Sequence, residues 1–253
     1  MSKTKIEWAD RVWNPVTGCT KISPGCKNCY AERMSRRLGK IKGSGYPPAD
    51  PFAVTIHPDR LEEPLKWRKP SRVFVCSMGD LFHEKVPRDF IHRVIYIPRV
   101  FPQHTFMFLT KRPQRMREVL LSPIRYMLPL HYKEGFPLLN VWLGVSIEDQ
   151  TTADDRIPWL LHTPAAKRFV SFEPALEPVD MTPYLSELDW VIMGGESGPG
   201  ARPMHPDWAR KVRDDCKETG APFFFKQWGG WNKKTGGHLV DGVEHLEFPE
   251  VMP

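Results

Sequence analysis

Three cysteines that lie close together in the chain are the residues whose spacing points most directly to chemistry. Cys19, Cys26 and Cys29 follow the pattern C-x6-C-x2-C, and the turn-forming sequence Ser-Pro-Gly precedes the second of them. Such a loop directs three thiolates at one centre. A structural zinc ion usually takes four protein ligands, whereas three thiolates leave one coordination position for an exogenous ligand. The loop therefore predicts a metal site with an open position.

The composition favours an anionic partner and a reducing compartment. The 253 residues include 36 Lys and Arg against 30 Asp and Glu, and the resulting net charge of +6 favours nucleic acid or a nucleotide. No stretch resembles a signal peptide or a membrane span, so we expect a cytoplasmic protein. In a reducing cytoplasm, clustered cysteines bind metal or react more often than they form disulfides, and the cysteine count of 5 is odd.

Seven short apolar runs follow the cysteine loop, and they are continuous rather than alternating. This pattern is typical of parallel strands that are buried on both faces. The runs cover residues 52–56, 72–76, 105–110, 141–146, 168–172, 190–195 and 222–226. A further short strand is expected within residues 6–16, before the cysteines.

Amphipathic segments of helical length lie between most of these strands. They cover residues 30–39, 89–100, 114–121, 153–161 and 207–219. The alternation gives about eight strand-and-helix units and predicts an α/β fold, a (β/α) barrel that is complete or partial and of the TIM type. We expect one domain over residues 1–253, with residues 230–253 as a C-terminal extension. A doubly wound open parallel sheet is the alternative.

Polar side chains follow the predicted strands one after another. In a parallel barrel the carboxyl ends of the strands form the catalytic mouth, so these side chains would share one rim with the cysteine loop. Surface loops are polar in any case, but the recurrence after successive strands favours a shared site. The candidates outside the loop are Cys76, Asp80, Ser146, Glu148, Glu173, Glu196, Ser197 and Lys226.

The loop and the barrel together suit one cofactor chemistry. Three thiolates after the first strand can hold a [4Fe-4S] cluster with one iron open to a ligand. S-adenosylmethionine chelates such an iron through its amino and carboxylate groups. One-electron reduction then cleaves the sulfonium and gives a 5′-deoxyadenosyl radical, while the protein supplies positioning and excludes water.

Six segments resemble the phage Gp37/Gp68 family, the three-Cys-motif proteins of DUF5131. They are residues 18–32, 77–83, 108–113, 171–174, 193–198 and 225–229, and the resemblance extends from Trp8 to Trp231. The family is similar to radical S-adenosylmethionine enzymes, in particular spore photoproduct lyase. The resemblance implies an enzyme that modifies or repairs a nucleic-acid base or nucleotide in a phage or prokaryotic setting. It also implies an electron donor and a three-Cys-motif partner protein.

Under this hypothesis the strand-end residues receive roles. A cysteine in spore photoproduct lyase donates a hydrogen atom, and Cys76 would do the same, although a small buried side chain is the alternative for this position. Asp80 or Glu148 would contact the amino group or a ribose of S-adenosylmethionine. The full assignment is Cys76, Asp80, Glu148, Glu173 and Lys226 to catalysis, Asp80, Ser146, Glu148, Glu196 and Ser197 to cofactor binding, and Cys19, Cys26 and Cys29 to the metal.

Two functions of other classes remain open. In the first, an iron-sulfur cluster or a zinc ion has only a structural role in a nucleic-acid or protein-binding module, and Cys76 or a histidine fills the open coordination position. In the second, the chain is a barrel hydrolase or nuclease whose carboxylates hold a hard cation. Lys111, Arg112, Arg202 and Lys226 would suit a phosphate or carboxylate of the substrate.

Overall fold

The structure is a computed structural model that describes residues 4, 6–122, 137–231 and 236–250. The chain forms two compact units. The first comprises residues 1–20, 31–143 and 162–166, and the second comprises residues 21–30, 144–161 and 167–253. The strand β6 (Val141–Ile147) contributes to both units, because the boundary falls between residues 143 and 144.

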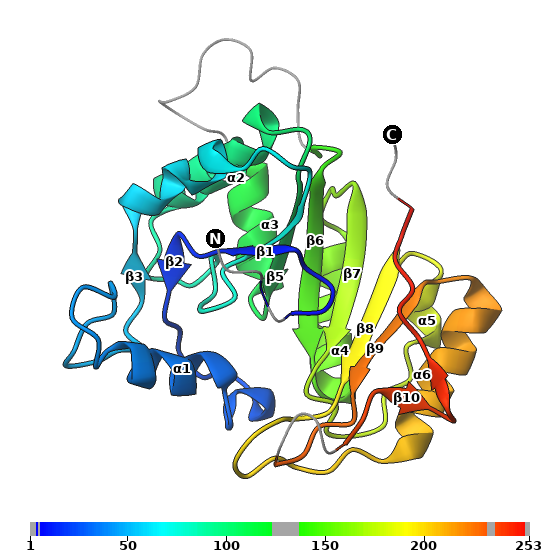
Figure 1. Cartoon of the computed structure of the whole chain (residues 1–253). Helices are drawn as coiled ribbons and strands as arrows, with labels where there is room; N and C mark the ends of the chain where they lie inside the picture. Colours follow the sequence, from blue (N-terminus) through cyan, green and yellow to red (C-terminus); the bar gives the residue numbers. More distant parts are fainter. Residues whose placement is uncertain (1–3, 5, 123–136, 232–235, 251–253) are drawn as a thin grey trace. The chain divides into compact units, whose positions relative to one another are not determined.

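Seven parallel strands form the main sheet, and their order in the sheet is their order in the chain (Figure 1). A doubly wound sheet reverses its strand order at a switch point, and this sheet does not. The predicted α/β fold with partial (β/α) barrel topology is therefore confirmed, and the open-sheet alternative does not fit. The strands are β1 (Arg11–Trp13), β4 (Arg72–Val75), β5 (Thr105–Thr110), β6, β7 (Lys167–Phe172), β8 (Trp190–Gly194) and β9 (Phe223–Gln227).

The predicted strand at residues 52–56 is the exception, so the expectation of about eight barrel units is wrong by one strand. Only β3 (Thr55–Ile56) forms there, and it pairs antiparallel with β2 (Val16–Thr17) in a separate two-stranded sheet. Consequently β4 pairs directly with β1. Prolines flank the run at both ends and Ile56 is 38% exposed, so the segment lacks the length and the two buried faces of a barrel strand.

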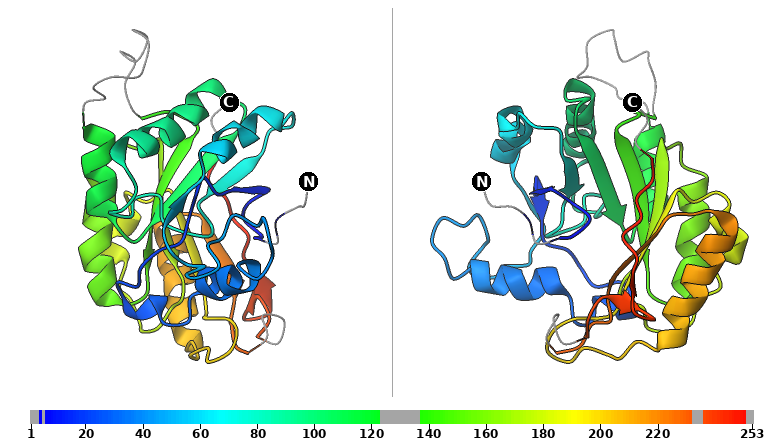
Figure 2. Two further views of the ribbon diagram at one scale, coloured as in Figure 1. Left: turned by 90° about the vertical axis from the view of Figure 1, so that its left-hand side faces the viewer. Right: turned by 45° about the vertical axis from the view of Figure 1, so that its right-hand side comes forward.

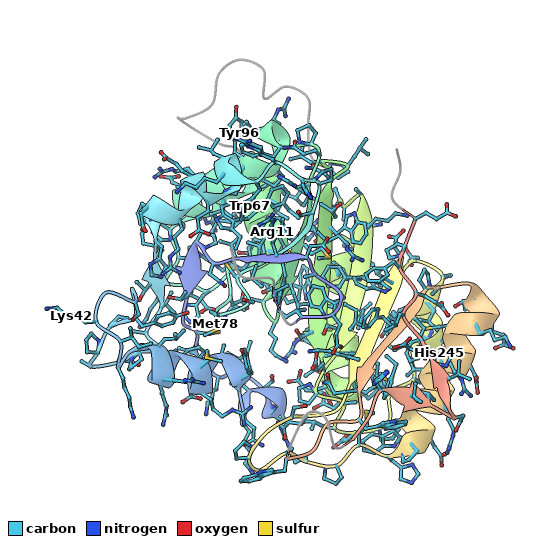
Figure 3. All side chains as sticks on the ribbon, in the orientation of Figure 1. Arg11, Lys42, Trp67, Met78, Tyr96 and His245 are labelled. Carbon is cyan, nitrogen blue, oxygen red and sulfur yellow. The ribbon has the colours of Figure 1, made fainter. Side chains whose placement is uncertain are left out.

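Among the described residues, the first unit contains four helices around its part of the sheet and in the segment after the cysteine loop. They are α1 (Tyr30–Leu38), η2 (Pro58–Lys66), α2 (Arg88–Val100) and α3 (Pro113–Leu121), where η marks a 3-10 helix. The helix α2 packs on α3 and η2. At β1 the guanidinium of Arg11 lies 5.3 Å from the centre of the Trp67 ring (Figure 3), so an arginine on a short strand also covers an aromatic side chain.

The second unit carries α4 (Gln150–Leu161), α5 (Thr182–Leu185) and α6 (Pro206–Thr219), and α6 packs against β9 (Figure 2). Its core includes Phe169, Trp190 and Phe224, which are almost fully buried. Gly144 is required on β6, because a Cβ there would lie 2.5 Å from the Phe169 ring. None of the helices in the described segments combines the length and the apolarity that crossing a bilayer needs.

The predicted C-terminal extension lies partly outside the described residues, which omit 232–235 and 251–253. Its described part forms a small antiparallel hairpin of β10 (Leu239–Val240) and β11 (Val243–Glu244). The Glu247 carbonyl oxygen accepts from Trp190 Nε1 over 2.8 Å, which ties this part to the core of the second unit. The single-domain organisation stays a prediction.

Candidate functional site

The first unit places Cys19 at the carboxyl ends of β1 and β4. Gly18 and Gly79 form an isolated parallel bridge there, and the Gly18 N–H donates to the Met78 carbonyl oxygen at 2.8 Å. Gly18 has a φ of 82°, and a Cβ on it would lie 2.1 Å from the Ala53 carbonyl oxygen. Only glycine fits this approach, so Gly18 sets the point at which Cys19 leaves the sheet.

The Cys19 thiol lies against a buried arginine from the end of β5. Arg112 Nη1 donates to Cys19 Sγ over 3.3 Å. Burial and the Asp80 carboxylate raise the pKa of the Cys19 thiol, and the Arg112 guanidinium opposes the rise, so that the pKa is about 11. Burial also disfavours the charge of Arg112, but Asp80 and Cys19 raise the pKa of Arg112 above its ordinary value. Arg112 is therefore a permanent cation within hydrogen-bonding distance of Sγ.

Asp80 anchors this arginine from the end of β4. Its carboxylate accepts from Arg112 Nη1 at 3.2 Å and from Thr110 Oγ1 at 2.8 and 2.9 Å to its two oxygens. The backbone N–H groups of Phe82 and Lys111 donate to it at 2.9 and 3.3 Å. A carboxylate can accept about four hydrogen bonds, so these donors from the first unit occupy the accepting positions of Asp80. The predicted contact of Asp80 with a cofactor stays a prediction.

Thr20, His83 and Glu84 complete the cluster, although the site residues assigned from the sequence do not include them. Arg112 Nη2 donates to Thr20 Oγ1 and Arg112 Nε donates to Glu84 Oε1, both at 2.9 Å. His83 is 2% exposed, and its Nε2 lies 2.9 Å from Thr20 Oγ1. Burial lowers the pKa of His83, and Arg112 lowers it further. Their position in the chain is the signal that points to them: His83 and Glu84 lie close to Asp80 in the segment after β4, and Thr20 directly follows Cys19.

Cys76 follows β4, as its position predicted, but it lies inside the protein. The residue is 3% exposed, and burial raises the pKa of its thiol far above the ordinary range. Its φ of 59° falls in the left-handed region, which is rare outside glycine. These features fit the small buried side chain, and the hydrogen-atom donor stays a prediction.

The second unit holds residues 21–30, with the other two cysteines of the loop. The predicted turn is confirmed as the short 3-10 helix η1 (Pro24–Cys26), in which the Cys26 N–H donates to the Ser23 carbonyl oxygen at 3.0 Å. Ser23 Oγ lies 3.6 Å from Cys26 Sγ. Cys29 directly precedes α1. Both thiols are free of disulfides and half-buried, which leaves them accessible to a ligand.

Asn28, between these two cysteines, fastens the loop to the end of β8. Its Nδ2 donates to Glu196 Oε2 at 2.9 Å and to the Gly200 carbonyl oxygen at 2.8 Å. Arg202 donates to the same carboxylate through Nη2 and Nε at 2.6 and 2.9 Å. Its Nη2 also donates to the Pro24 carbonyl oxygen at 3.1 Å. Burial pushes the pKa of Glu196 upward, but the Arg202 and Asn28 donors bring it below its ordinary value. Glu196 is thus an ionised anchor of the loop.

Glu148 holds the turn of the loop from the end of β6. The Gly25 N–H donates to Glu148 Oε1 at 3.3 Å, and a Cβ on Gly25 would lie 3.0 Å from Glu148 Cδ. Glu148 is fully buried and pairs with Arg156 Nη1 at 2.9 Å. The same nitrogen donates to the Ser146 carbonyl oxygen at 2.7 Å. The predicted residues Ser146 and Glu148 therefore lie together, joined by an arginine that no motif indicates.

Glu173 and Lys226 meet after β7 and near the end of β9. Lys226 Nζ donates to the two Glu173 carboxylate oxygens at 2.6 and 2.7 Å. Gln227 Nε2 donates to Glu173 Oε1 at 2.9 Å and to the Gly195 carbonyl oxygen at 3.1 Å. Ser197 follows β8 and forms an isolated bridge with the segment after β9. The second unit therefore brings the predicted polar residues to the carboxyl ends of its strands.

All four predicted carboxylates are ion-paired within their own unit. A hard-cation site turns its carboxylate oxygens towards the metal, whereas each of these carboxylates faces a Lys or Arg. Arg112, Arg202 and Lys226, which are predicted to suit a phosphate or carboxylate of the substrate, are used in these pairs. The pairs are Asp80–Arg112, Glu148–Arg156, Glu173–Lys226 and Glu196–Arg202.

The chemistry of the donor set suits an iron-sulfur cluster. The three loop cysteines form no disulfide, and one of them accepts an N–H from Arg112, as the sulfur ligands of such clusters do. In the part of the chain that the structure describes, no three His, Cys, Asp or Glu side chains gather as ligands for a metal ion. The ligand role of the cysteines accordingly rests on their spacing and their chemistry.

Comparisons with known proteins give one family and one group of structures. Residues 3–249 match the profile of the family described as "Protein of unknown function (DUF5131)". No curated protein matches the chain. A cysteine-to-serine mutant of spore photoproduct lyase is similar at 12% identity and a TM-score of 0.49, over 86% of this chain and 75% of that chain.

Two further structures of the lyase are similar in the same way. One is a double mutant with bound AdoMet and dinucleoside spore photoproduct, at 12% identity and a TM-score of 0.49. The other is a complex with dinucleoside spore photoproduct, at 10% identity and a TM-score of 0.47. Each match covers 86% of this chain, which spans 64% of either lyase chain.

Proposed function

Since the chain belongs to the DUF5131 family, we propose that it is a radical S-adenosylmethionine enzyme that acts on a nucleic-acid base or nucleotide. One observation carries the proposal. Three cysteines that form no disulfide, Cys19, Cys26 and Cys29, stand in a loop after the first strand of a parallel sheet whose strand order is that of a (β/α) barrel. We assign these thiols as the ligands of a [4Fe-4S] cluster whose fourth iron takes S-adenosylmethionine.

The chain's own residues hold the cysteine loop in place. When bound, the reduced cluster supplies the electron for cleavage of the sulfonium bond of S-adenosylmethionine. The bond from Arg112 orients Cys19 in the first unit. In the second unit, Glu148 and Glu196 hold the backbone at Gly25 and the side chain of Asn28. The Glu148 and Glu196 contacts keep this part of the loop in place without contacting its sulfur atoms.

The charge of the chain supports an anionic substrate. The net charge is +6, and Arg37, Lys40 and Lys42 are exposed on and after α1. We propose repair or modification of a base or nucleotide as the reaction, with Glu173 and Lys226 among the residues that act on it. Reduction of the cluster requires an electron donor. We also propose a three-Cys-motif protein as a partner, and a cytoplasmic location in a phage or prokaryotic setting. The name Gp37/Gp68 stays a prediction.

Anaerobic reconstitution tests the proposal. The full chain is incubated with iron and sulfide, and bound iron and sulfide are measured together with the electron paramagnetic resonance spectrum after dithionite. We expect about four iron and four sulfide per chain. Addition of S-adenosylmethionine should then yield 5′-deoxyadenosine, detected by mass spectrometry. A reconstituted chain with neither the cluster nor 5′-deoxyadenosine would contradict the proposal.

Cysteine variants provide the matched controls. Cys19→Ser, Cys26→Ser and Cys29→Ser should each lose most of the iron. Cys216→Ala removes a buried thiol from α6, outside the loop, and should retain it. Equal iron content in all four variants would show that the loop does not bind the cluster.

The two alternatives have outcomes of their own in the same measurements. A structural metal predicts one zinc per chain and no response to S-adenosylmethionine. A hydrolase predicts magnesium-dependent cleavage of nucleic acid that survives the loss of all three cysteines. The ion pairing of the four carboxylates does not favour the hydrolase, because its metal would have to displace a Lys or Arg at each of them.

A further inference from the structure

Arg112 is placed to act on one thiol of the cysteine loop. It is the residue directly before α3, its side chain is 5% exposed, and each of the three nitrogens of its guanidinium donates a hydrogen bond. Nε bonds to Glu84 Oε1 at 2.9 Å, and Nη1 bonds to Asp80 Oδ2 at 3.2 Å. Nη1 also donates to Cys19 Sγ at 3.3 Å, and Nη2 donates to Thr20 Oγ1 at 2.9 Å. One planar cation therefore contacts Cys19 and the residue after it.

Two strand ends fix the position of this cation. Asp80 follows β4 and Thr110 ends β5, and these strands pair in register, with Val75 opposite Phe108. The Thr110 hydroxyl donates to Asp80 and accepts from the Arg112 N–H at 2.9 Å. Both the backbone and the guanidinium of Arg112 are thus held by buried groups of the sheet, which limits how far the guanidinium can move.

His83 fixes the other side of the contact. The Lys85 N–H donates to His83 Nδ1 at 3.1 Å, so Nδ1 is the acceptor nitrogen of the ring. The proton of the neutral ring then resides on Nε2, which donates to Thr20 Oγ1 at 2.9 Å. Thr20 Oγ1 accepts from both His83 and Arg112, so two hydrogen bonds hold the residue beside Cys19.

We infer that Arg112 is a positioning residue that orients Cys19 Sγ as a cluster ligand and stabilises the reduced form of the bound cluster. The inference rests on the proposed function. Addition of an electron makes a cluster and its thiolates more negative, and a buried cation with an N–H bonded to a ligand sulfur stabilises that extra charge. Arg112 thereby raises the reduction potential, which makes the cluster easier to reduce.

The decisive measurement is the midpoint potential of the cluster in the reconstituted full chain. It is obtained from a redox titration in which electron paramagnetic resonance reports the reduced cluster. Arg112→Gln removes the charge, and we expect its potential to shift to a more negative value. Arg112→Lys keeps the charge but loses the planar fork, and we expect a smaller shift in the same direction. Arg117→Gln is the matched control on α3, because Arg117 Nε bonds to the His162 carbonyl oxygen rather than to the loop. Its potential should equal that of the wild type.

A folded Arg112→Gln variant with a full cluster and a wild-type potential would overturn the inference. If Arg112→Gln does not fold, Arg112→Lys and Thr20→Val decide. An unshifted potential in both variants overturns the inference, and a negative shift in either one supports it. If the wild-type chain binds no cluster, the proposed function fails before any variant is compared. The inference then fails with it, because Cys19 has no cluster to bind. Failure of the inference alone appears as a bound cluster with unchanged potentials.

Discussion

Asn28 Nδ2 donates to Glu196 Oε2 at 2.9 Å, although 168 residues separate them in the chain. This bond joins the residue between Cys26 and Cys29 to a carboxylate after β8. The carboxylate is 5% exposed and also holds Arg202. The cysteine loop therefore depends for its shape on a strand end far away in the sequence.

Glu196→Gln should loosen the loop. The variant keeps the size of the side chain but removes the charge that holds Arg202 and Asn28, and hydrogen bonds to charged groups contribute about 1.5–3 kcal/mol. We expect the backbone amides of residues 21–30 to exchange hydrogen faster, measured by mass spectrometry. Glu187→Gln, at an exposed position of the second unit, should leave that exchange unchanged. Equal protection of residues 21–30 in both variants would argue against the anchor.

Arg156→Met should be strongly destabilising. Glu148 is 0% exposed and would lose the guanidinium that neutralises it. Removal of one partner of a buried ion pair costs about 3–5 kcal/mol. Urea unfolding of the variant should show a loss of this size. The double variant Glu148→Leu/Arg156→Met should recover part of the loss, because no buried charge is left, and a double variant less stable than Arg156→Met would refute this account.

The unfolding free energy of the chain should decrease as the pH is lowered, and His57 contributes to this decrease. Burial and, to a smaller extent, the Arg60 guanidinium lower the pKa of His57 from 6.5 to about 4. The unfolded chain therefore binds the proton first, so this contribution is complete above pH 6.5 and is lost as the pH falls towards 4. One such group changes the unfolding free energy by at most about 1.4 kcal/mol per pH unit.

His57→Gln is the matched variant for that window. Glutamine retains a hydrogen-bonding partner for Thr17 Oγ1, which lies 2.8 Å from His57 Nε2, but it does not titrate. Urea unfolding at pH 7, 6 and 5 should show a shallower decline for the variant than for the wild type. Identical slopes would mean that the pKa of His57 is not lowered on folding.

Gly79→Ala should displace the start of the cysteine loop. A Cβ on Gly79 would lie 2.7 Å from the Gly18 carbonyl oxygen and 3.1 Å from the Gly18 nitrogen, so backbone has to move. We expect a loss of about 1–3 kcal/mol in unfolding free energy, together with less iron after reconstitution because Cys19 follows Gly18. Ser77→Ala, in the same turn, adds no atoms and should retain its iron. Wild-type iron content and stability in Gly79→Ala would contradict the close approach.

The sequence by itself determined the parallel sheet to a large extent. Continuous apolar runs are a local signal, because a strand buried on both faces has little room for polar residues. The run at 105–110 forms β5 with the same bounds, and the helix at 207–219 differs from α6 by one residue. The cysteines and the carboxylates after the strands were recognisable for the same reason, since residue type and spacing are read directly.

Only the tertiary structure decided which of these groups meet. The run at 52–56 is apolar enough for a barrel strand, but its partner is β2, since pairing depends on distant segments and on burial. Asp80 was recognisable as a strand-end carboxylate, yet its use as the anchor of Arg112 follows from the register of β4 and β5. The bond from Arg112 to Cys19 spans 93 residues. A single sequence records each charge and each thiol, but long-range packing selects their partners.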